Sequence, residues 1–270
     1  LGKATDVAAI GFADNTVIDG AATIKVGSAK GDGGFVETSG KQLSMLGRVD
    51  GQAAGKNGEW LIDPTDITIT TVNNGTAAAS TGNITISKDI SWSSANTLTL
   101  VANDSINGTG NISMTGGGSV VFNTGNVTTT AAFTGVINGN GSVYKQGLGN
   151  FTLSGNNTYS GGTTIEAGTL NNNRANSTAT LNVSSYEFTS SGVGTGVVKV
   201  LSGGTLYNNV TLYNKLEIAG AGASGTRGAL DTSSYGSVLG QTLIKASGTA
   251  IGGAASIIGD LSDDGQSLGL

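Results

Sequence analysis

The strongest constraint on the fold of this chain is a short apolar–polar–apolar pattern that recurs along its length. In an extended segment, successive side chains point to opposite faces, so each triplet places its two apolar residues on one face. The central residue is usually Thr or Ser, and β-branched Thr suits the outer face of a strand. The triplets are Ile67–Ile69, Ile84–Ile86, Leu98–Leu100, Ile112–Met114, Phe151–Leu153, Leu181–Val183, Val198–Val200 and Leu216–Ile218.

Gly and Asn separate these triplets and predict sharp turns between short strands. The chain of 270 residues contains 46 Gly and a single Pro, Pro64. Gly and Asn reach positive φ angles at low energetic cost, so runs such as Asn73–Gly75, Asn138–Gly141 and Ser202–Gly204 let the chain bend abruptly. Helix-forming residues never dominate a long window, and Gly recurs too often for helix interiors. The sequence therefore predicts an all-β protein.

Two all-β architectures fit this pattern, namely an antiparallel sandwich or barrel and a β-solenoid of stacked coils. The spacing of like triplets favours the solenoid, because a coil places equivalent residues at regular intervals. Ile84, Leu98 and Ile112 follow one another at steps of 14 positions, and Phe151 precedes Leu170 by 19 positions. We interpret both steps as close to one coil.

Composition and a second repeated unit also favour the solenoid. The unit Gly168-Thr169-Leu170 recurs as Gly204-Thr205-Leu206. Aromatic residues make up 5% of the chain, fewer than we expect in a sandwich core of this length. At about 20 residues per coil, the lower end of the range for repeat proteins, we expect Ile, Val, Leu and Ala to fill a narrow interior.

The residue types that the chain lacks exclude several classes of protein. Without His and Cys there is no Ser-His-Asp triad, no thiolate nucleophile, no disulfide and no His or Cys metal site, and we predict no cofactor. A net charge of −5 argues against nucleic acid as a partner, because phosphate recognition needs clustered Lys and Arg. No apolar run approaches the ~18 residues of a membrane-spanning helix, so we expect no membrane insertion of this segment. A hydrophobic content of 37% argues against disorder.

Two phrases near the start resemble a known family of secreted proteins. They are GGFVETSG at residues 33–40 and GEWLIDPTDITI at residues 58–69, about 20 residues apart. Together they resemble the large exoproteins of Gram-negative two-partner secretion, which include filamentous haemagglutinins and high-molecular-weight adhesins. The amino-terminal secretion domain of that family is not recognisable here, so we interpret the segment as stalk downstream of it.

A third phrase, at residues 139–170, resembles the passenger-associated repeat of autotransporter proteins. The resemblance lies in KQGLG at residues 145–149 and NTYSGGT at residues 157–163, which occur in the order typical of that repeat. Both families imply a right-handed parallel β-helix exported to the cell surface. The two marks usually belong to different secretion routes, so the translocator stays open. The absence of Cys agrees with export of an unfolded chain, because periplasmic disulfides would block it.

We expect one continuous solenoid and interpret it as a fragment of a longer chain, because it begins at Leu1 without an initiator Met or a signal peptide. Residues 1–70 resemble two-partner-secretion exoproteins, and residues 71–138 form further coils. Residues 139–170 carry the passenger-associated repeat, and residues 171–270 form further coils.

Aromatic side chains are candidates for contact with sugars. Trp60, Trp92, Tyr207 and Tyr213 would each offer a ring to the apolar face of a pyranose if exposed, and Tyr207 and Tyr213 lie in neighbouring coil segments. Aromatic residues on solenoids also cover loop bases or stack in ladders, and scattered apolar residues at a surface are normal. Both interpretations stay open.

Twelve Asn residues lie in Asn-x-Ser/Thr sequences, the acceptor pattern for N-glycosylation. Chance alone predicts about five to six for this composition. Selection for glycosylation, which the resemblance to adhesins permits, is one explanation. The other is that a turn Asn followed by a strand Thr creates the pattern automatically. The twelve are Asn74, Asn83, Asn103, Asn107, Asn111, Asn126, Asn140, Asn150, Asn156, Asn176, Asn182 and Asn209.

The acidic residues predict turns in preference to a catalytic or metal site. Glu59, Asp63 and Asp66 flank Trp60 as the carboxylates of a glycosidase would, but the family resemblance already explains this phrase and acids are common in β-turns. Asp32 in a Gly-rich segment resembles part of a calcium loop, but the Gly-Gly-x-Gly-x-Asp array is absent.

The sequence therefore predicts a non-enzymatic stalk or adhesive rod of a secreted surface exoprotein of a Gram-negative bacterium, which mediates adhesion to cells or surfaces. Its expected partners are an outer-membrane translocator during export and glycans or proteins on host or neighbouring cells. One alternative is a polysaccharide-processing β-helix enzyme, which would gather several Asp with Lys or Arg in one groove. The 13 Lys and Arg and 18 Asp and Glu show no such cluster in the sequence. Another is the stalk of a contact-dependent toxin, whose toxic end would lie elsewhere.

Overall fold

The structure is a computed structural model of the chain. It describes residues 15–19, 21–45, 48–51, 53–56, 58–69, 75–79, 83–86, 89–93, 95, 97–125, 131–174, 177–182, 185–254, 256–257 and 259–263. Side chains are described for the same residues except 15, 39–45, 48, 59–69, 75–79, 177–182, 185–189 and 256. Within these ranges every regular element is a strand, and no helix has the length and apolar character needed to span a membrane.

Two large sheets account for most of the strands. The long sheet has eleven strands: β1 (Asn15–Ile18), β3 (Phe35–Met45), β5 (Glu59–Ile69), β7 (Ile84–Ile86), β10 (Ile106–Gly108), β13 (Ala131–Phe133), β16 (Asn150–Leu153), β18 (Gly168–Asn172), β22 (Gly204–Asn208), β25 (Leu230–Thr232) and β28 (Ile251–Gly253). The second sheet has nine: β6 (Gly75–Ala79), β9 (Thr97–Ala102), β12 (Ser119–Thr124), β15 (Ser142–Gln146), β17 (Thr163–Ile165), β21 (Val198–Val200), β24 (Leu216–Ile218), β27 (Thr242–Ile244) and β30 (Leu261–Ser262).

Four smaller sheets contain the remaining strands. Two have three strands each: β8 (Ile90–Trp92), β11 (Ile112–Met114) and β14 (Ile137–Gly139) in one, and β23 (Thr211–Leu212), β26 (Ser237–Val238) and β29 (Ser256–Ile257) in the other. Two have two strands each: β2 (Thr23–Lys25) with β4 (Arg48–Asp50), and β19 (Ser177–Asn182) with β20 (Ser185–Ser190).

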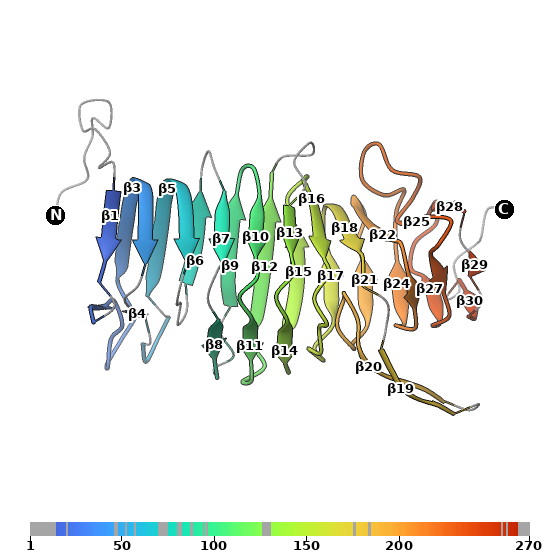
Figure 1. Ribbon diagram of the computed structural model, residues 1–270, viewed down its shortest axis with the longest axis horizontal. Coiled ribbons are helices and arrows are strands. Elements are labelled where there is room, and N and C mark those ends of the chain that lie inside the picture. The colour runs from blue at the N-terminus through green and yellow to red at the C-terminus, as the bar shows by residue number, and fades with distance from the viewer. Residues whose placement is uncertain are drawn as a thin grey trace.

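The order in which the chain visits these sheets defines a coil. From β10 the chain passes from the long sheet to a three-stranded sheet and then to the second sheet, and it repeats this circuit with β13, β14 and β15. Each strand pairs in parallel with the equivalent strand of the neighbouring coil. The strands therefore stand side by side along the long axis of the molecule, with β1 and β30 near its opposite ends (Figure 1). The predicted parallel β-solenoid is confirmed.

Two of the predicted coil-to-coil relationships are also confirmed. Phe151 in β16 pairs with Leu170 in β18, and Gly168–Leu170 pairs in register with Gly204–Leu206. The second relationship spans 36 positions, as the bond between Asn172 and Asn208 also shows. The extra length is explained by the β19–β20 hairpin, which is inserted between the two coils and extends away from the body of the solenoid (Figure 1). This hairpin is antiparallel, a local exception to the parallel pairing of the coils.

The interpretation of the 14-residue steps as coils is wrong. Ile84, Leu98 and Ile112 lie in three different sheets, so these steps lead around the circuit instead of along the axis. The coil-to-coil partner of Ile84 is Ile106, 22 positions later. Triplets on all faces of a coil share one alternating pattern, because every face points one side of its strands inward. The spacing between two triplets therefore does not tell whether they lie on different faces of the circuit or on the same face of neighbouring coils.

Apolar side chains fill the interior, as the alternation predicts. Ile84 and Ile86 are fully buried, whereas Thr85 between them is exposed. Most of the buried apolar residues are Ile, Val, Leu and Ala, as expected, and three Phe rings pack among them. The ring centroids of Phe122 and Phe151 lie 4.5 Å apart and those of Phe122 and Phe133 lie 5.7 Å apart. Burial of each such side chain stabilises the fold by about 1.5–3 kcal/mol.

Candidate functional site

The coil that carries the KQGLG and NTYSGGT phrases has polar residues in its interior. Lys145 on β15 is fully buried, and its Nζ donates to the carbonyl oxygens of Gln146 at 2.6 Å, Gly147 at 2.8 Å and Ala167 at 3.3 Å. Burial lowers the pKa of Lys145 to about 7, whereas three carbonyl acceptors favour the ammonium form. The Lys therefore ties the turn after β15 to the turn before β18.

The second phrase closes the same coil through buried hydroxyl groups. The Thr163 hydroxyl donates to the carbonyl oxygen of Val193 at 2.9 Å, so the Tyr159 hydroxyl donates to Thr163 Oγ1 at 2.6 Å. Burial of Tyr159 raises its pKa above the ordinary value of a phenol. Gly162 has φ +92°, a conformation that other residues rarely adopt. These contacts join the phrase to the segment that follows the hairpin.

Asn157 connects three coils from the interior. Its Oδ1 accepts a hydrogen bond from the backbone N–H of Ile137 at 2.8 Å, and its Nδ2 donates to the carbonyl oxygen of Gly192 at 2.7 Å. The side chain is fully buried, so no water competes for either backbone group. Sequence reasoning identified this phrase only by resemblance, and the structure supplies its physical role, which is to satisfy buried backbone groups between coils.

The four aromatic candidates lie in different surroundings. Trp92 is 8% exposed and belongs to the core. Tyr207 is half-buried on the outer face of β22 and lines a groove. Tyr213 is also half-buried, but it does not line that groove. The side chain of Trp60, like those of Glu59, Asp63 and Asp66, lies outside the described residues. Sugar contact by any of them stays a prediction.

Several of the twelve glycosylation candidates form contacts between coils. Asn107 Oδ1 accepts from the backbone N–H of Ala132 at 3.0 Å, and Asn111 Oδ1 accepts from that of Val136 at 2.9 Å. Such contacts give these residues a structural reason to be Asn, and glycosylation stays a prediction.

The exposure of the candidates differs. The exposed ones are Asn103, Asn140 and Asn156; the half-buried ones are Asn83, Asn107, Asn111, Asn150 and Asn209; Asn74, Asn126, Asn176 and the side chain of Asn182 lie outside the described residues.

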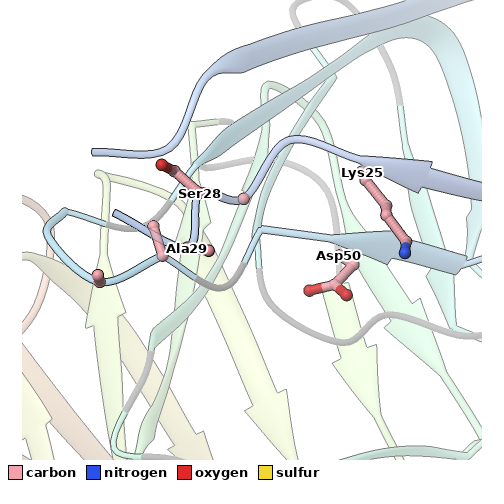
Figure 2. Close-up of a pocket in the computed structure, with 7 residues that line it drawn as sticks. Lys25, Ser28, Ala29 and Asp50 are labelled. Carbon is pink, nitrogen blue, oxygen red and sulfur yellow. The ribbon is translucent and has the colours of Figure 1, made fainter. Parts of the chain in front are cut away.

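One groove lies near the first described coils (Figure 2). It encloses about 390 Å³ between β2, β4 and the turns that follow them. Lys25 and Asp50 lie on the two neighbouring strands and pair in register, and Ser28, Ala29 and Ala53 complete much of the lining. The described residues that line it are small apart from one pair of opposite charges, and none of them is aromatic.

A second groove, which we name the Tyr207 groove, lies on the outer face of the long sheet. It encloses about 400 Å³, and the side chains of β16, β18 and β22 form its floor. Residues 223–226, in the loop between β24 and β25, form one wall, and Leu148 forms the other. None of the described residues that line it is charged. Among the described residues of the whole chain, no group of three or more acidic side chains is placed to hold a metal ion.

Comparison with known proteins agrees with the resemblance of the central coil. Residues 143–171 match the Passenger-associated-transport-repeat family. A segment of 119 residues is 32% identical to the Adhesin BmaC autotransporter of Brucella suis biovar 1 (strain 1330), and it covers 41% of this chain and 3% of that protein. Together these matches support an autotransporter-type passenger.

The passenger interpretation rests on a limited part of each chain. The chain spans only 3% of the length of the curated relative that it matches. No solved structure matches the chain. The resemblance of residues 1–70 to two-partner-secretion exoproteins is not shown by these matches and stays a prediction.

Proposed function

We propose that this chain is a segment of the passenger of a secreted or surface-displayed adhesin of a Gram-negative bacterium. The observation that carries the proposal is the position of the matched repeat, because residues 143–171 run from β15 to β18 and supply strands to neighbouring coils of the parallel solenoid. The similarity to an autotransporter adhesin supports the same role. In this role the stacked coils form a rod that presents its lateral faces to another surface.

The physical properties of the rod fit this proposal. Each coil contacts its neighbours, so the chain can fold coil by coil after it leaves a translocator, without distant segments having to meet. The absence of Cys leaves the unfolded chain without disulfides before export. We propose an outer-membrane autotransporter barrel as the export partner, with a two-partner transporter as the alternative, and glycans or proteins of other cells as the adhesive partners.

Attachment of coated beads tests the adhesive role. Beads that carry the purified chain should attach to cultured epithelial cells or to neighbouring bacteria more often than beads coated with an inert protein of similar charge. Beads coated with the urea-unfolded chain are the matched control, because they keep the composition and lose the rod. Equal attachment of all three kinds of bead would contradict the proposal.

The non-enzymatic part of the proposal has its own test. The purified chain should release no reducing sugar from acidic or neutral polysaccharides over a long incubation. Release of oligosaccharides that disappears after unfolding of the chain would establish the polysaccharide-processing alternative in its place.

A further inference from the structure

The Tyr207 groove has the lining that a neutral sugar requires. Tyr207 and Leu148 supply apolar surface, and Leu148 is 69% exposed. Asn150 and Asn171 contribute amides, and Ser224 contributes a hydroxyl group. Ligand pockets combine a mostly apolar surface with a few polar groups that fix orientation, and their volumes start at about 300 Å³.

The ring of Tyr207 lies beside polar groups at the spacing of neighbouring strands. Tyr207 pairs in register with Asn171 on β18, and Asn171 pairs with Thr152 on β16. Asn171 Nδ2 also donates to Thr152 Oγ1 at 3.3 Å, which orients the amide along this row. The Tyr207 hydroxyl has no hydrogen-bond partner within the described parts of the chain, so it is available to a ligand. A ring therefore lies next to oriented hydrogen-bonding groups.

One wall of the groove is fixed by hydrogen bonds to the sheet. Thr205 is fully buried beneath the β24–β25 loop, which Figure 1 shows above β22 and β25. Its Oγ1 accepts from the backbone N–H of Ala223 at 2.8 Å and donates to the carbonyl oxygen of Gly228 at 2.9 Å. The Thr226 hydroxyl donates to the carbonyl oxygen of Ala223 at 2.7 Å. A wall held in this way is already organised before a ligand binds, which reduces the entropic cost of binding.

The charges near the groove are neutralised by one another. Arg227 follows the wall, and its Nη2 lies 2.8 Å from Asp231 Oδ1, while its Nε donates to the same oxygen at 2.9 Å. Asp231 is the register partner of Tyr207 on β25 and is almost fully buried. Neither residue lines the groove. An anionic or cationic ligand would therefore find no opposite charge among the described residues that line the groove.

The repeated Gly-Thr-Leu unit explains why the groove lies at this place. Thr169 and Thr205 occupy equivalent positions on neighbouring coils and pair in register. The β24–β25 loop is hydrogen-bonded to Thr205, whereas Thr169, one coil away and 8% exposed, lies in the floor of the groove. The groove therefore lies beside the place where the loop contacts the sheet.

From these observations we propose that the Tyr207 groove binds a neutral pyranose unit of a glycan, with the sugar ring stacked on Tyr207 and its hydroxyl groups bound by Asn171 and Asn150. The proposal rests on the adhesive function proposed above and names the chemistry of its ligand. The same pyranose could belong to a free oligosaccharide or to a glycan attached to a protein or lipid, and all three present the same chemistry.

Saturation-transfer NMR and calorimetry with defined sugars test the proposal. The probes are lactose, N-acetyllactosamine, maltotriose, cellotriose and chitotriose, with 3′-sialyllactose as a charged comparison. At least one neutral probe should bind the intact chain, and Tyr207→Ala should weaken that binding about tenfold or more, whereas Tyr207→Phe should change it less than about threefold. Tyr235→Ala is the matched control, because Tyr235 is 84% exposed outside the groove, and it should leave binding unchanged.

A second variant fills the groove without removing the ring. Ser224 is exposed on the wall, so Ser224→Trp should abolish binding of the neutral probe while the thermal unfolding midpoint stays that of the wild-type chain. Ser247→Trp places the same side chain at an exposed turn elsewhere and should bind like the wild type. Binding that survives both Tyr207→Ala and Ser224→Trp would overturn the proposal, as would binding of the sialylated probe alone.

The bead assay separates failure of the groove from failure of the adhesive role. Wild-type beads that attach to glycan-bearing cells should lose attachment when those cells are treated with glycosidases that remove neutral sugars, or when the beads carry Tyr207→Ala. Equal attachment of wild-type and Tyr207→Ala beads would overturn the groove and leave the adhesive role intact. Sugar binding without any attachment would overturn the adhesive role and leave the groove intact.

Discussion

The coils before the matched repeat and the coil that carries it are filled in different ways. Between β7 and β13 the interior consists almost entirely of apolar residues such as Ile84, Ile106 and Phe122. The repeat coil instead buries Lys145 and Asn157 and satisfies them through hydrogen bonds to backbone carbonyls and N–H groups. The first kind of coil depends on volume and shape, whereas the second depends on the presence of particular partners.

The largest expected effect concerns the apolar coils. Phe122 contacts both of the other interior rings, so Phe122→Ala should lower the free energy of unfolding by about 3–5 kcal/mol through lost burial and a residual cavity. Phe122→Leu keeps most of the volume and should cost less than about 1.5 kcal/mol. Urea unfolding followed by circular dichroism measures both values. A loss below about 1 kcal/mol for Phe122→Ala would show that this interior is not close-packed.

Removal of a hydrogen-bonding partner in the repeat coil should cost nearly as much. Asn157→Leu retains a similar volume but leaves the Ile137 N–H and the Gly192 carbonyl buried without a partner, so we expect a loss of about 2–4 kcal/mol. The exposed Asn173 is the matched control, and Asn173→Leu should cost less than about 0.5 kcal/mol. Urea unfolding measures both losses. Equal losses in the free energy of unfolding for the two variants would contradict the claim that the repeat coil depends on particular hydrogen-bonding partners.

Lys145 makes the stability of the repeat coil depend on pH. Its pKa is about 7 in the folded chain and about 10.5 in the unfolded chain, so between these values the unfolded chain binds more protons and stability rises with pH. The carbonyl acceptors reduce the effect, and we expect a rise of about 1–3 kcal/mol from pH 7 to pH 9.5 that is absent in Lys145→Met. Above about pH 10, ionisation of Tyr159 on unfolding acts in the opposite direction.

Unfolding curves recorded at intervals of half a pH unit measure the difference between wild type and Lys145→Met. A wild-type curve that falls between pH 7 and pH 9.5, relative to the variant, would contradict the assignment of a caged, desolvated amine.

A pair of Thr residues gives the smallest and sharpest comparison. Thr124 Oγ1 lies buried without a hydrogen-bond partner among the described residues, so Thr124→Val should leave stability unchanged or raise it by about 0.5–1 kcal/mol. Thr163 Oγ1 bonds both Tyr159 and Val193, so Thr163→Val should lower stability by about 1–2 kcal/mol. Calorimetry measures the unfolding midpoint of each variant, which should fall for Thr163→Val and stay unchanged or rise for Thr124→Val. A fall for both variants, or a rise for both, would contradict the account.

The sequence pattern predicted the strands well because each one is encoded locally. Ile84-Thr85-Ile86 forms β7 with the predicted inward and outward faces, and Phe151 and Leu170 lie on neighbouring coils as their spacing predicted. The interpretation of the 14-residue steps as successive coils failed because the turns between the faces of the solenoid contain different numbers of residues. Ile67 pairs with Ile84 after 17 positions, whereas Asn15 pairs with Gln42 after 27, although the strands stay in register.

The site depended on contacts that no local pattern contains. Lys145 reads as an ordinary polar position in an alternating strand, and its burial follows from carbonyl groups that the turn after β15 and the turn before β18 bring together. The Tyr207 groove requires the β24–β25 loop to fold back onto Thr205, 18 positions before the loop residue that it bonds. The aromatic candidate Tyr207 could be named from the sequence, but the wall that makes a groove beside it could not.

Distances between spin labels along the second sheet test the central claim of a parallel solenoid most directly. The chain lacks Cys, so pairs of introduced Cys carry the labels without background. Position 99 is labelled with position 144, 199 or 243 in turn, because Thr99, Tyr144, Lys199 and Leu243 lie in one register row two, four and six strands apart. Strand spacing of ~4.8 Å predicts backbone separations of ~10, ~19 and ~29 Å, with no extra length contributed by the β19–β20 hairpin. Distances that fail to grow in equal steps, or that shorten beyond the hairpin as in a two-layer antiparallel sandwich, would contradict the account.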